Sequence, residues 1–145
     1  MCMCHHACYG CAGVCFESIT VSGAESLLQA SKFGTYTKLA NVTQGGRPVY
    51  QRVGSTVAYL FYWPSTRNWL IGSSYSSGTA GVKSTGSAGA ACPYQATGWQ
   101  AYTGTAWVGT YPITVAPAAG QTRPPTTAAP TTVGERSRCA RMRSA

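Results

Sequence analysis

Short apolar runs, separated by turns that contain glycine or proline, fill the middle of this 145-residue chain. Runs rich in β-branched and aromatic residues, several of them alternating with polar ones, are typical of strands. They span residues 19–21, 35–39, 47–53, 57–63, 69–71, 98–103, 105–108 and 111–115. Because no segment between them offers a helical crossover, we expect antiparallel pairing. The pattern predicts an all-β fold, a small antiparallel sheet arranged as a sandwich or a partly open barrel.

Two segments depart from the strand pattern. Residues 24–31 (AESLLQAS) carry the only helical pattern and predict one short N-terminal helix. Residues 72–98 are mostly small, and a structureless stretch of that length is uncommon inside a compact domain. That stretch either contains a short strand near residues 80–83 or forms a mobile binding loop. The aliphatic Val82 favours the strand.

Aromatic residues concentrate in segment 59–72, YLFYWPSTRNWLIG. A five-residue hairpin loop at 64–68 would place Trp63 opposite Trp69. Alternation then puts Tyr59, Phe61, Trp63, Trp69 and Ile71 on one face, and Leu60, Tyr62 and Leu70 on the other. Burying each large side chain contributes about 1.5–3 kcal/mol, which a small domain needs. We therefore predict a core role for this segment, with residues 65–68 and the indole edges the most exposed.

Composition divides the chain into three parts. Residues 1–18 form a head that holds five of the seven cysteines and both histidines. Residues 19–115 form the β-rich globular domain, and residues 116–145 combine a Pro/Thr-rich, mucin-like linker with a basic tail predicted to be disordered. No apolar run reaches the ~20 residues of a membrane span, and the N-terminus does not have the pattern of a signal peptide.

The net charge of +8 is spread over the domain and the tail. A basic protein attracts polyanions, although solubility alone also accounts for such a charge. Binding of nucleic acid would need Arg47, Arg52, Arg67 and Lys83 to converge beside a stacking tyrosine. We do not expect nucleic acid to be the partner.

The globular domain is poor in groups that perform acid–base chemistry. Residues 19–115 contain no histidine and no aspartate, and Glu25 is their only carboxylate. General acid–base catalysis usually needs a pair of titratable groups with different pKa values. Phosphate-binding and dinucleotide-binding motifs are absent from the sequence. We therefore expect a protein that is not an enzyme and that uses no cofactor.

The cysteine-rich head has three interpretations. Cys4, His5, Cys8, Cys11 and Cys15 include a CxxC pair and could supply zinc ligands. The head could instead be the end of a truncated disulfide-rich module, or an unstructured product of a wrong start codon. Cys92 could pair with a head cysteine, pair with Cys139, or stay a buried thiol.

Asn41-Val-Thr43 matches the acceptor pattern for N-glycosylation. Together with the Pro/Thr-rich linker, whose composition is frequent in O-glycosylated proteins, it favours a secreted protein. We expect an extracellular or cell-surface location.

Several motifs carry a resemblance. They are Gly34-Thr-Tyr36, Gly46-Arg-Pro-Val-Tyr50, Tyr59-Leu-Phe-Tyr62, Trp69-Leu-Ile-Gly72, Cys92-Pro93 and Trp99 with Trp107. Residues 19–115 thereby resemble a β-rich repeat module of predicted secreted and cell-surface proteins in algae and other eukaryotes. The chain has Gly45 where the pattern usually has Asn, and Ala116 where a second cysteine is expected after the last strand. The resemblance implies a modular extracellular architecture without catalysis.

Two functions follow as expectations. The first is a non-catalytic extracellular binding or adhesion module that contacts a glycan or another surface protein, with Arg67, Asn68, Trp69 and Tyr75 as candidate ligand contacts. The second is a structural repeat or spacer unit of a surface or wall protein, which would associate through sheet edges. Ile19-Thr-Val21 recurs as Ile113-Thr-Val115, an echo that a tandem array or chance would explain.

Overall fold

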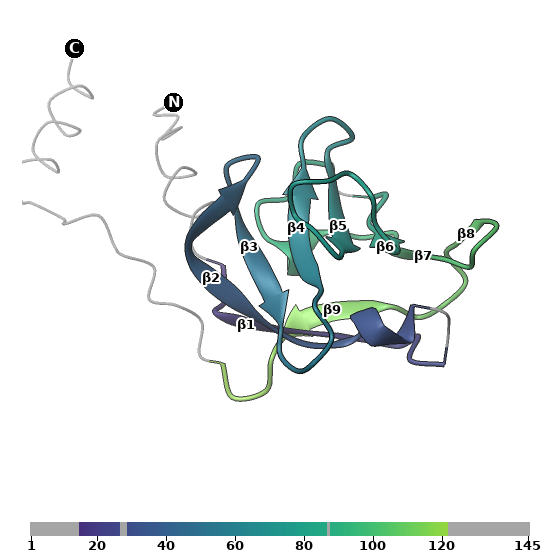
Figure 1. The fold of residues 1–145 in the computed structure, drawn as a ribbon, viewed down its shortest axis with the longest axis horizontal. Coiled ribbons are helices and arrows are strands. Elements are labelled where there is room, and N and C mark those ends of the chain that lie inside the picture. The colour runs from purple at the N-terminus through teal and green to yellow at the C-terminus, as the bar shows by residue number, and fades with distance from the viewer. Residues whose placement is uncertain (1–14, 27–28, 87, 122–145) are drawn as a thin grey trace, which may run out of the picture. The chain divides into compact units, whose positions relative to one another are not determined.

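Nine strands form one antiparallel sheet in residues 15–26, 29–86 and 88–121, which are the residues that the computed structural model describes (Figure 1). The strands are β1 (Ser18–Ser22), β2 (Gly34–Gln44), β3 (Arg47–Arg52), β4 (Tyr59–Trp63), β5 (Asn68–Gly72), β6 (Val82–Lys83), β7 (Gln100–Tyr102), β8 (Trp107–Val108) and β9 (Thr114–Pro117). Eight strands follow one another as a meander, and β9 returns to pair with β1. The sheet curls into a half-barrel, so the predicted all-β, antiparallel character is confirmed (Figure 1).

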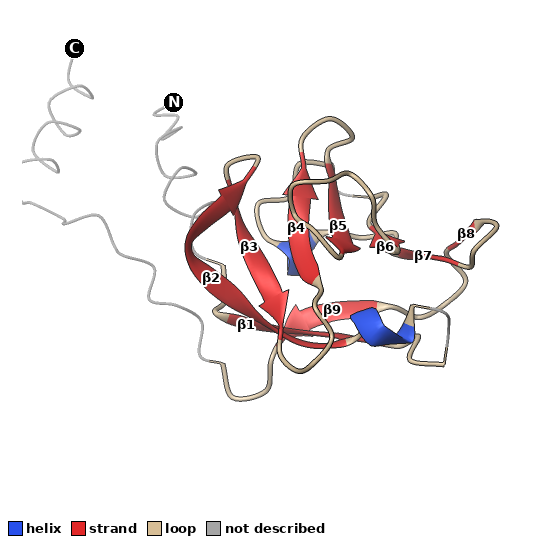
Figure 2. Ribbon diagram, viewed as in Figure 1, coloured by secondary structure: helices blue, strands red, loops and turns tan. Residues whose placement is uncertain are grey.

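The predicted N-terminal helix is wrong. The described helical pieces are two short 3₁₀ turns, η1 (Ala30–Lys32) and η2 (Pro93–Gln95), drawn in blue in Figure 2. The chain bends after β1 at Gly23, whose φ is +104°, and the Gly23 N–H donates a 2.9 Å hydrogen bond to the Glu25 carboxylate. A helix of two turns is marginal in isolation, and this local bond competes with its first turn. No helix among the described residues is both long and apolar enough to cross a membrane.

The β4–β5 hairpin differs from the prediction by one residue. Its loop has four residues, 64–67, and the Arg67 N–H donates to the Pro64 carbonyl at 3.2 Å. Trp63 consequently pairs with Asn68, and Tyr62 pairs with Trp69. A slip of one residue moves a side chain to the other face, so the two indoles lie on opposite faces of the sheet. The predicted grouping of Trp63 with Trp69 and Ile71 on one face is therefore wrong.

Apolar side chains nevertheless cover both faces of the central strands. The inner cluster, on the face of Tyr62 and Trp69, contains Tyr36, Tyr50, Leu60, Tyr62, Trp69, Ile71, Val82 and Trp99 among its buried residues. The outer cluster consists of Val49, Phe61 and Leu70, with Leu39, Val42, Tyr59, Trp63, Tyr75 and Ala80 packed against them. The prediction that segment 59–72 is mainly core is thus confirmed for Leu60 through Tyr62 and for Trp69 through Ile71.

Two further sequence predictions are confirmed. Gly45 and Gly46 form the tight β2–β3 turn, both with positive φ, +59° and +73°. Val82, fully buried, anchors the short strand β6 within the stretch of small residues. The Ile-Thr-Val echo also has a structural account, because β1 and β9 are neighbours and Val21 pairs with Val115. The two tripeptides serve adjacent strands of one sheet, and no second unit is needed to explain them.

Two tyrosine hydroxyls of the inner cluster are hydrogen-bonded to backbone. Tyr36 donates to the Lys32 carbonyl at 2.5 Å and Tyr50 to the Phe16 carbonyl at 2.9 Å. Burial raises the pKa of Tyr36 far above its usual range, against a smaller lowering by Arg52. Burial also raises the pKa of Tyr50, with smaller contributions from Tyr94 and Glu17 in the same direction. Both phenols therefore stay protonated in the folded state where they would ionise in the unfolded chain.

This difference predicts an alkaline loss of stability. A folded-state pKa above the unfolded value gives stability that is complete below pH ~10 and declines above it, by about 1.4 kcal/mol per pH unit for each tyrosine. We expect the free energy of unfolding, measured with urea, to be flat from pH 7 to 9 and to fall from pH 10 to 11.5. Tyr36→Phe should reduce the slope by about half. An unchanged free energy across pH 10 to 11.5 would contradict the burial of these hydroxyls.

Candidate functional site

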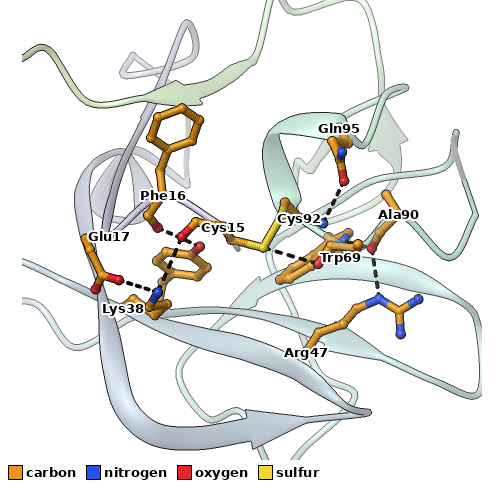
Figure 3. Close-up of a disulfide and its surroundings, with 11 residues drawn as sticks. Cys15, Phe16, Glu17, Lys38, Arg47, Trp69, Ala90, Cys92 and Gln95 are labelled. Carbon is orange, nitrogen blue, oxygen red and sulfur yellow. Dashed lines mark hydrogen bonds and ion pairs between the residues drawn. A yellow bond between two sulfur atoms is a disulfide. The ribbon is translucent and has the colours of Figure 1, made fainter. Parts of the chain in front are cut away.

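A disulfide joins Cys15, just ahead of β1, to Cys92, just ahead of η2 (Figure 3). Both cysteines are buried. Among the alternatives for Cys92, pairing with a head cysteine is the one that the structure contains. Because β9 ends beside the start of β1, with Ile19 opposite Pro117, a cysteine ahead of β1 lies close to where one after β9 would lie.

The disulfide also corrects the metal prediction. Cys15 is not a free thiolate and cannot serve as a zinc ligand, so its assignment as one is wrong. Cys4, His5, Cys8 and Cys11 lie outside the described residues. Within the part of the chain that is described, no three His, Cys, Asp or Glu side chains gather as metal ligands would.

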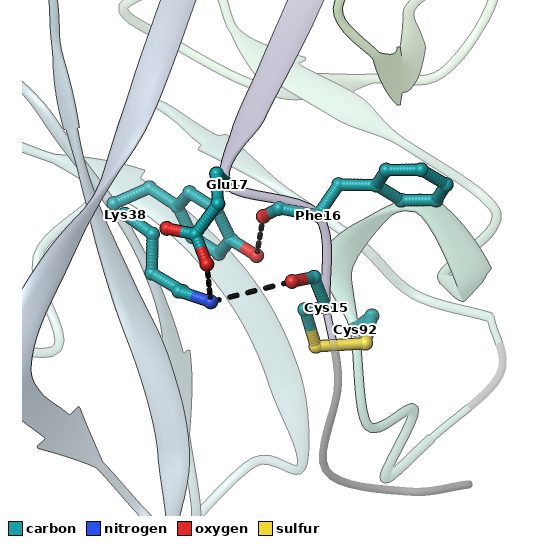
Figure 4. A network of polar contacts seen from close by, with 6 residues as sticks. Cys15, Phe16, Glu17, Lys38 and Cys92 are labelled. Atoms are coloured by element: carbon teal, nitrogen blue, oxygen red, sulfur yellow. Dashed lines mark hydrogen bonds and ion pairs between the residues drawn. A yellow bond between two sulfur atoms is a disulfide. The ribbon is translucent and has the colours of Figure 1, made fainter. Parts of the chain in front are cut away.

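Residues 15–17, which the composition assigned to the head, are bound to the sheet (Figure 4). The Lys38 ammonium forms an ion pair with Glu17 and donates to the Cys15 carbonyl at 3.3 Å. The Lys38 N–H also donates to the Glu17 carbonyl at 2.8 Å. Residues 15–17 therefore belong to the same compact unit as the sheet.

A second set of contacts fixes the long connection between β6 and η2. The Ala90 carbonyl accepts two hydrogen bonds, from the Trp69 indole Nε1 and the Arg47 Nε, both 2.9 Å long (Figure 3). Arg47 donates further to the carbonyls of Gly89 at 2.6 Å and Gly45 at 3.2 Å. Its guanidinium carbon lies 3.8 Å from the centre of the Tyr62 ring. This connection is thus held against the inner face rather than left as a mobile loop.

The disulfide should be a major source of stability. It closes a loop with a sequence separation of 77 residues, and the chain-entropy argument assigns about 4–5 kcal/mol to a loop of that size. We expect the double variant Cys15→Ala/Cys92→Ala to unfold at a much lower urea concentration than the parent chain. A non-reducing peptide map should show the Cys15–Cys92 link directly. If reducing agent leaves the unfolding midpoint of the parent chain unchanged, this assignment is wrong.

An open cleft lies along the seam of the half-barrel, between β9 and the segment that leads into β7. Its volume is about 520 Å³, within the range of ligand sites. One wall comes from residues 97–100 and Thr85, and the other from Tyr111 and residues 113–115. Its lining residues include no acidic or basic side chain. Among the strands of the described residues, β9 is an edge strand that pairs only with β1, so the barrel is not closed on this side and the cleft lies there.

The cleft combines an apolar base with polar sides. Trp99 and Val115 are mostly buried and belong to the inner cluster, against which Tyr111 packs while remaining half-exposed. The Trp99 indole donates to the Ala96 carbonyl at 3.1 Å, and this bond fixes the ring. The Thr85 hydroxyl donates to the Gly98 carbonyl at 2.8 Å, and Gln100 lines the same wall. An accessible ring beside uncharged hydrogen-bonding groups suits a neutral polar ligand.

The four residues predicted to contact a ligand do not share one surface. Arg67 is exposed and Asn68 is half-buried opposite Trp63. Tyr75 is half-buried against the outer cluster, with its ring 5.1 Å from that of Tyr59. Trp69 is only 1% exposed and faces the inner cluster, so its ring cannot stack on a ligand and its assignment as a contact is wrong.

Sequence reasoning missed the residues of the cleft. Trp99, Gln100 and Tyr111 come together because β9 returns to β1 across the sheet. Only the spacing of Trp99 and Tyr111, one on either side of the last hairpin, offered a signal. That signal has meaning only once the strand order is known.

Asn41, the predicted glycosylation acceptor, lies in an irregular part of β2. The pairing with β3 shifts register between Lys38 and Thr43, and Asn41 has a φ of +59°. Its side chain is exposed. Asparagine tolerates the left-handed conformation better than most residues, which suits it to this bulge.

The described residues hold two carboxylates, Glu17 and Glu25, and no histidine. Glu17 pairs with Lys38, away from the cleft lining. The N–H of Gly23 holds the pKa of Glu25 below its usual value, so this group stays ionised at neutral pH. The lining of the cleft therefore includes no carboxylate and no imidazole.

No family model, curated protein or solved structure matches the chain. The interpretation of the cleft therefore depends on its geometry. The resemblance of residues 19–115 to a repeat module stays a prediction.

Proposed function

We propose that this chain is a non-catalytic extracellular binding module that holds a neutral saccharide in the seam cleft. The observation that carries the proposal is the lining of that cleft, where the half-exposed Tyr111 ring adjoins Gln100 and Thr85 without any charge. Sugar rings present apolar C–H faces to aromatic rings and hydroxyls to amides and hydroxyls. An open groove also suits an extended chain better than a small metabolite, which enclosed sites favour.

Two features of the domain support an extracellular location. A buried disulfide is typical of proteins that fold in oxidising compartments. Asn41 stands on an exposed bulge, where an N-linked glycan could be attached without disturbing the core. Neither feature bears on the ligand, so location and ligand are separate parts of the proposal.

The alternative, a structural spacer that assembles through its sheet edges, has less support. The edge strands β8 and β9 contain two and four residues. Pro117 ends β9, and proline cannot donate to an added strand. Short edges with proline oppose strand addition, so we expect a monomer by light scattering.

The cleft can be tested with one substitution on each face of the sheet. Tyr111→Ala removes the accessible ring and should weaken binding of neutral oligosaccharides, identified on a glycan array, by about tenfold, or about 1.4 kcal/mol. Binding should change little between 50 and 500 mM NaCl, because no charge takes part. Affinities would be measured by calorimetry.

Tyr75→Ala is the matched control, because Tyr75 is also a half-buried tyrosine but packs on the outer cluster. It should leave the affinity unchanged, and urea unfolding of both variants separates loss of binding from loss of folding. Loss of binding in Tyr75→Ala but not in Tyr111→Ala would move the site to the other face. The absence of any neutral glycan ligand on the array would overturn the proposal.

A further inference from the structure

Two arginines from different elements converge on one backbone position. A Cβ atom built on Gly89 would lie 3.3 Å from Nη2 of Arg67 and 3.8 Å from Nη2 of Arg47. The Tyr62 hydroxyl lies 3.9 Å from the same point. Gly89 itself has a φ of +80°, and its N–H donates to the Arg67 carbonyl at 3.2 Å. Because Gly89 has no side chain, two guanidinium groups and a hydroxyl approach the same backbone position.

No carboxylate of the described residues forms an ion pair with either arginine. The two acidic groups in the described part of the chain are engaged elsewhere, Glu17 with Lys38 and Glu25 with the Gly23 N–H. The Arg47 guanidinium donates to three neutral backbone carbonyls, and the Arg67 side chain is exposed. Two like charges held close together repel each other, and a bound anion would relieve that repulsion.

The backbone of Arg67 adds an independent observation. Its φ of +57° lies in the left-handed region, where glycine and asparagine are favoured and a long side chain is strained. Gly45, in the β2–β3 turn, has nearly the same φ of +59°, and there the residue is a glycine. An arginine in place of glycine costs the hairpin stability, and strained residues of this kind cluster at functional sites.

We propose that Arg47 and Arg67, with the Tyr62 hydroxyl beside them, bind the sulfate ester of an acidic glycan. Arg47 is fixed in advance by three carbonyls and the Tyr62 ring, which lowers the entropy cost of binding. Two guanidinium groups that approach one point from two elements suit a tetrahedral oxyanion, whereas a single arginine fork suits a carboxylate. This site is separate from the seam cleft and does not depend on its occupation.

A nucleic acid fits the same residues less well. Single-stranded nucleic acid is held by bases stacked on exposed rings along a basic groove. Here Arg47 covers the face of the Tyr62 ring, and Tyr62 is only 4% exposed. Arg52 donates to the Phe33 carbonyl, and Lys83 lies over the Trp107 ring, so neither is part of this pair.

Arg67→Gly tests the site, because it removes one cation while relieving the backbone. We expect it to raise the midpoint of urea unfolding and to weaken binding of the full chain to dextran sulfate at least tenfold in 150 mM NaCl. Unsulfated dextran should not bind at this site. Lys83→Gln removes the same charge elsewhere and should change the affinity less than twofold.

The remaining variants and polyanions test whether binding is specific to this site and to a sulfate ester. Equal loss in Arg67→Gly and Lys83→Gln would mean unspecific attraction to net charge and would overturn the proposal, as would unchanged binding in Arg67→Gly. Binding of alginate or single-stranded DNA that is as tight and as dependent on Arg67 would overturn the assignment to a sulfate ester. Tyr111→Ala should bind dextran sulfate normally, which keeps failure of this site distinct from failure of the cleft.

Discussion

The hydrogen bonds to the Ala90 carbonyl are the interaction on which the rest of the structure depends. A half-barrel has an open inner face, and here the connection between β6 and η2 contributes Ala90 and Cys92 to the cluster on that face. The Trp69 indole and the Arg47 guanidinium both donate to that one carbonyl. They fix a segment of small residues that has little apolar surface of its own to hold it in place. Without this attachment the inner rings would face water, and the disulfide would have to hold the segment alone.

Most of the fold could be predicted from sequence because its signals are local. Glycine pairs at turns and apolar runs at strands depend on a few neighbouring residues, as at Gly45–Gly46 and in β4. The hairpin register failed because it depends on Arg67 adopting a left-handed conformation, which its residue type does not suggest. The helix failed because a local bond from Gly23 to Glu25 and the bend after β1 outweighed a weak propensity.

The candidate sites were harder to predict because each joins residues that are distant in sequence. Trp69 is of a residue type that often contacts ligands, yet a difference of one residue in the hairpin register places its ring in the core. Cys15 has the spacing of a metal ligand, yet the antiparallel return of β9 to β1 brings the start of β1 within reach of the segment that bears Cys92. Tyr111 and Trp99 form a cleft only because nothing closes the seam. The deciding fact is hairpin register for Trp69 and strand order for Cys15 and the cleft, and sequence alone gives neither.

The same attachment has different consequences for two surfaces of the domain. Holding the connection at Ala90 uses the hydrogen-bonding capacity of Arg47 toward the backbone but leaves its charge unneutralised. The connection also carries Gly89, whose lack of a side chain allows the Arg67 guanidinium to lie close to its backbone. Nearer to β6, the same connection supplies Thr85 to the uncharged cleft at the seam. One fixed segment thus contacts both the arginine pair and the uncharged cleft, and the two carboxylates of the described residues, Glu17 and Glu25, are engaged elsewhere.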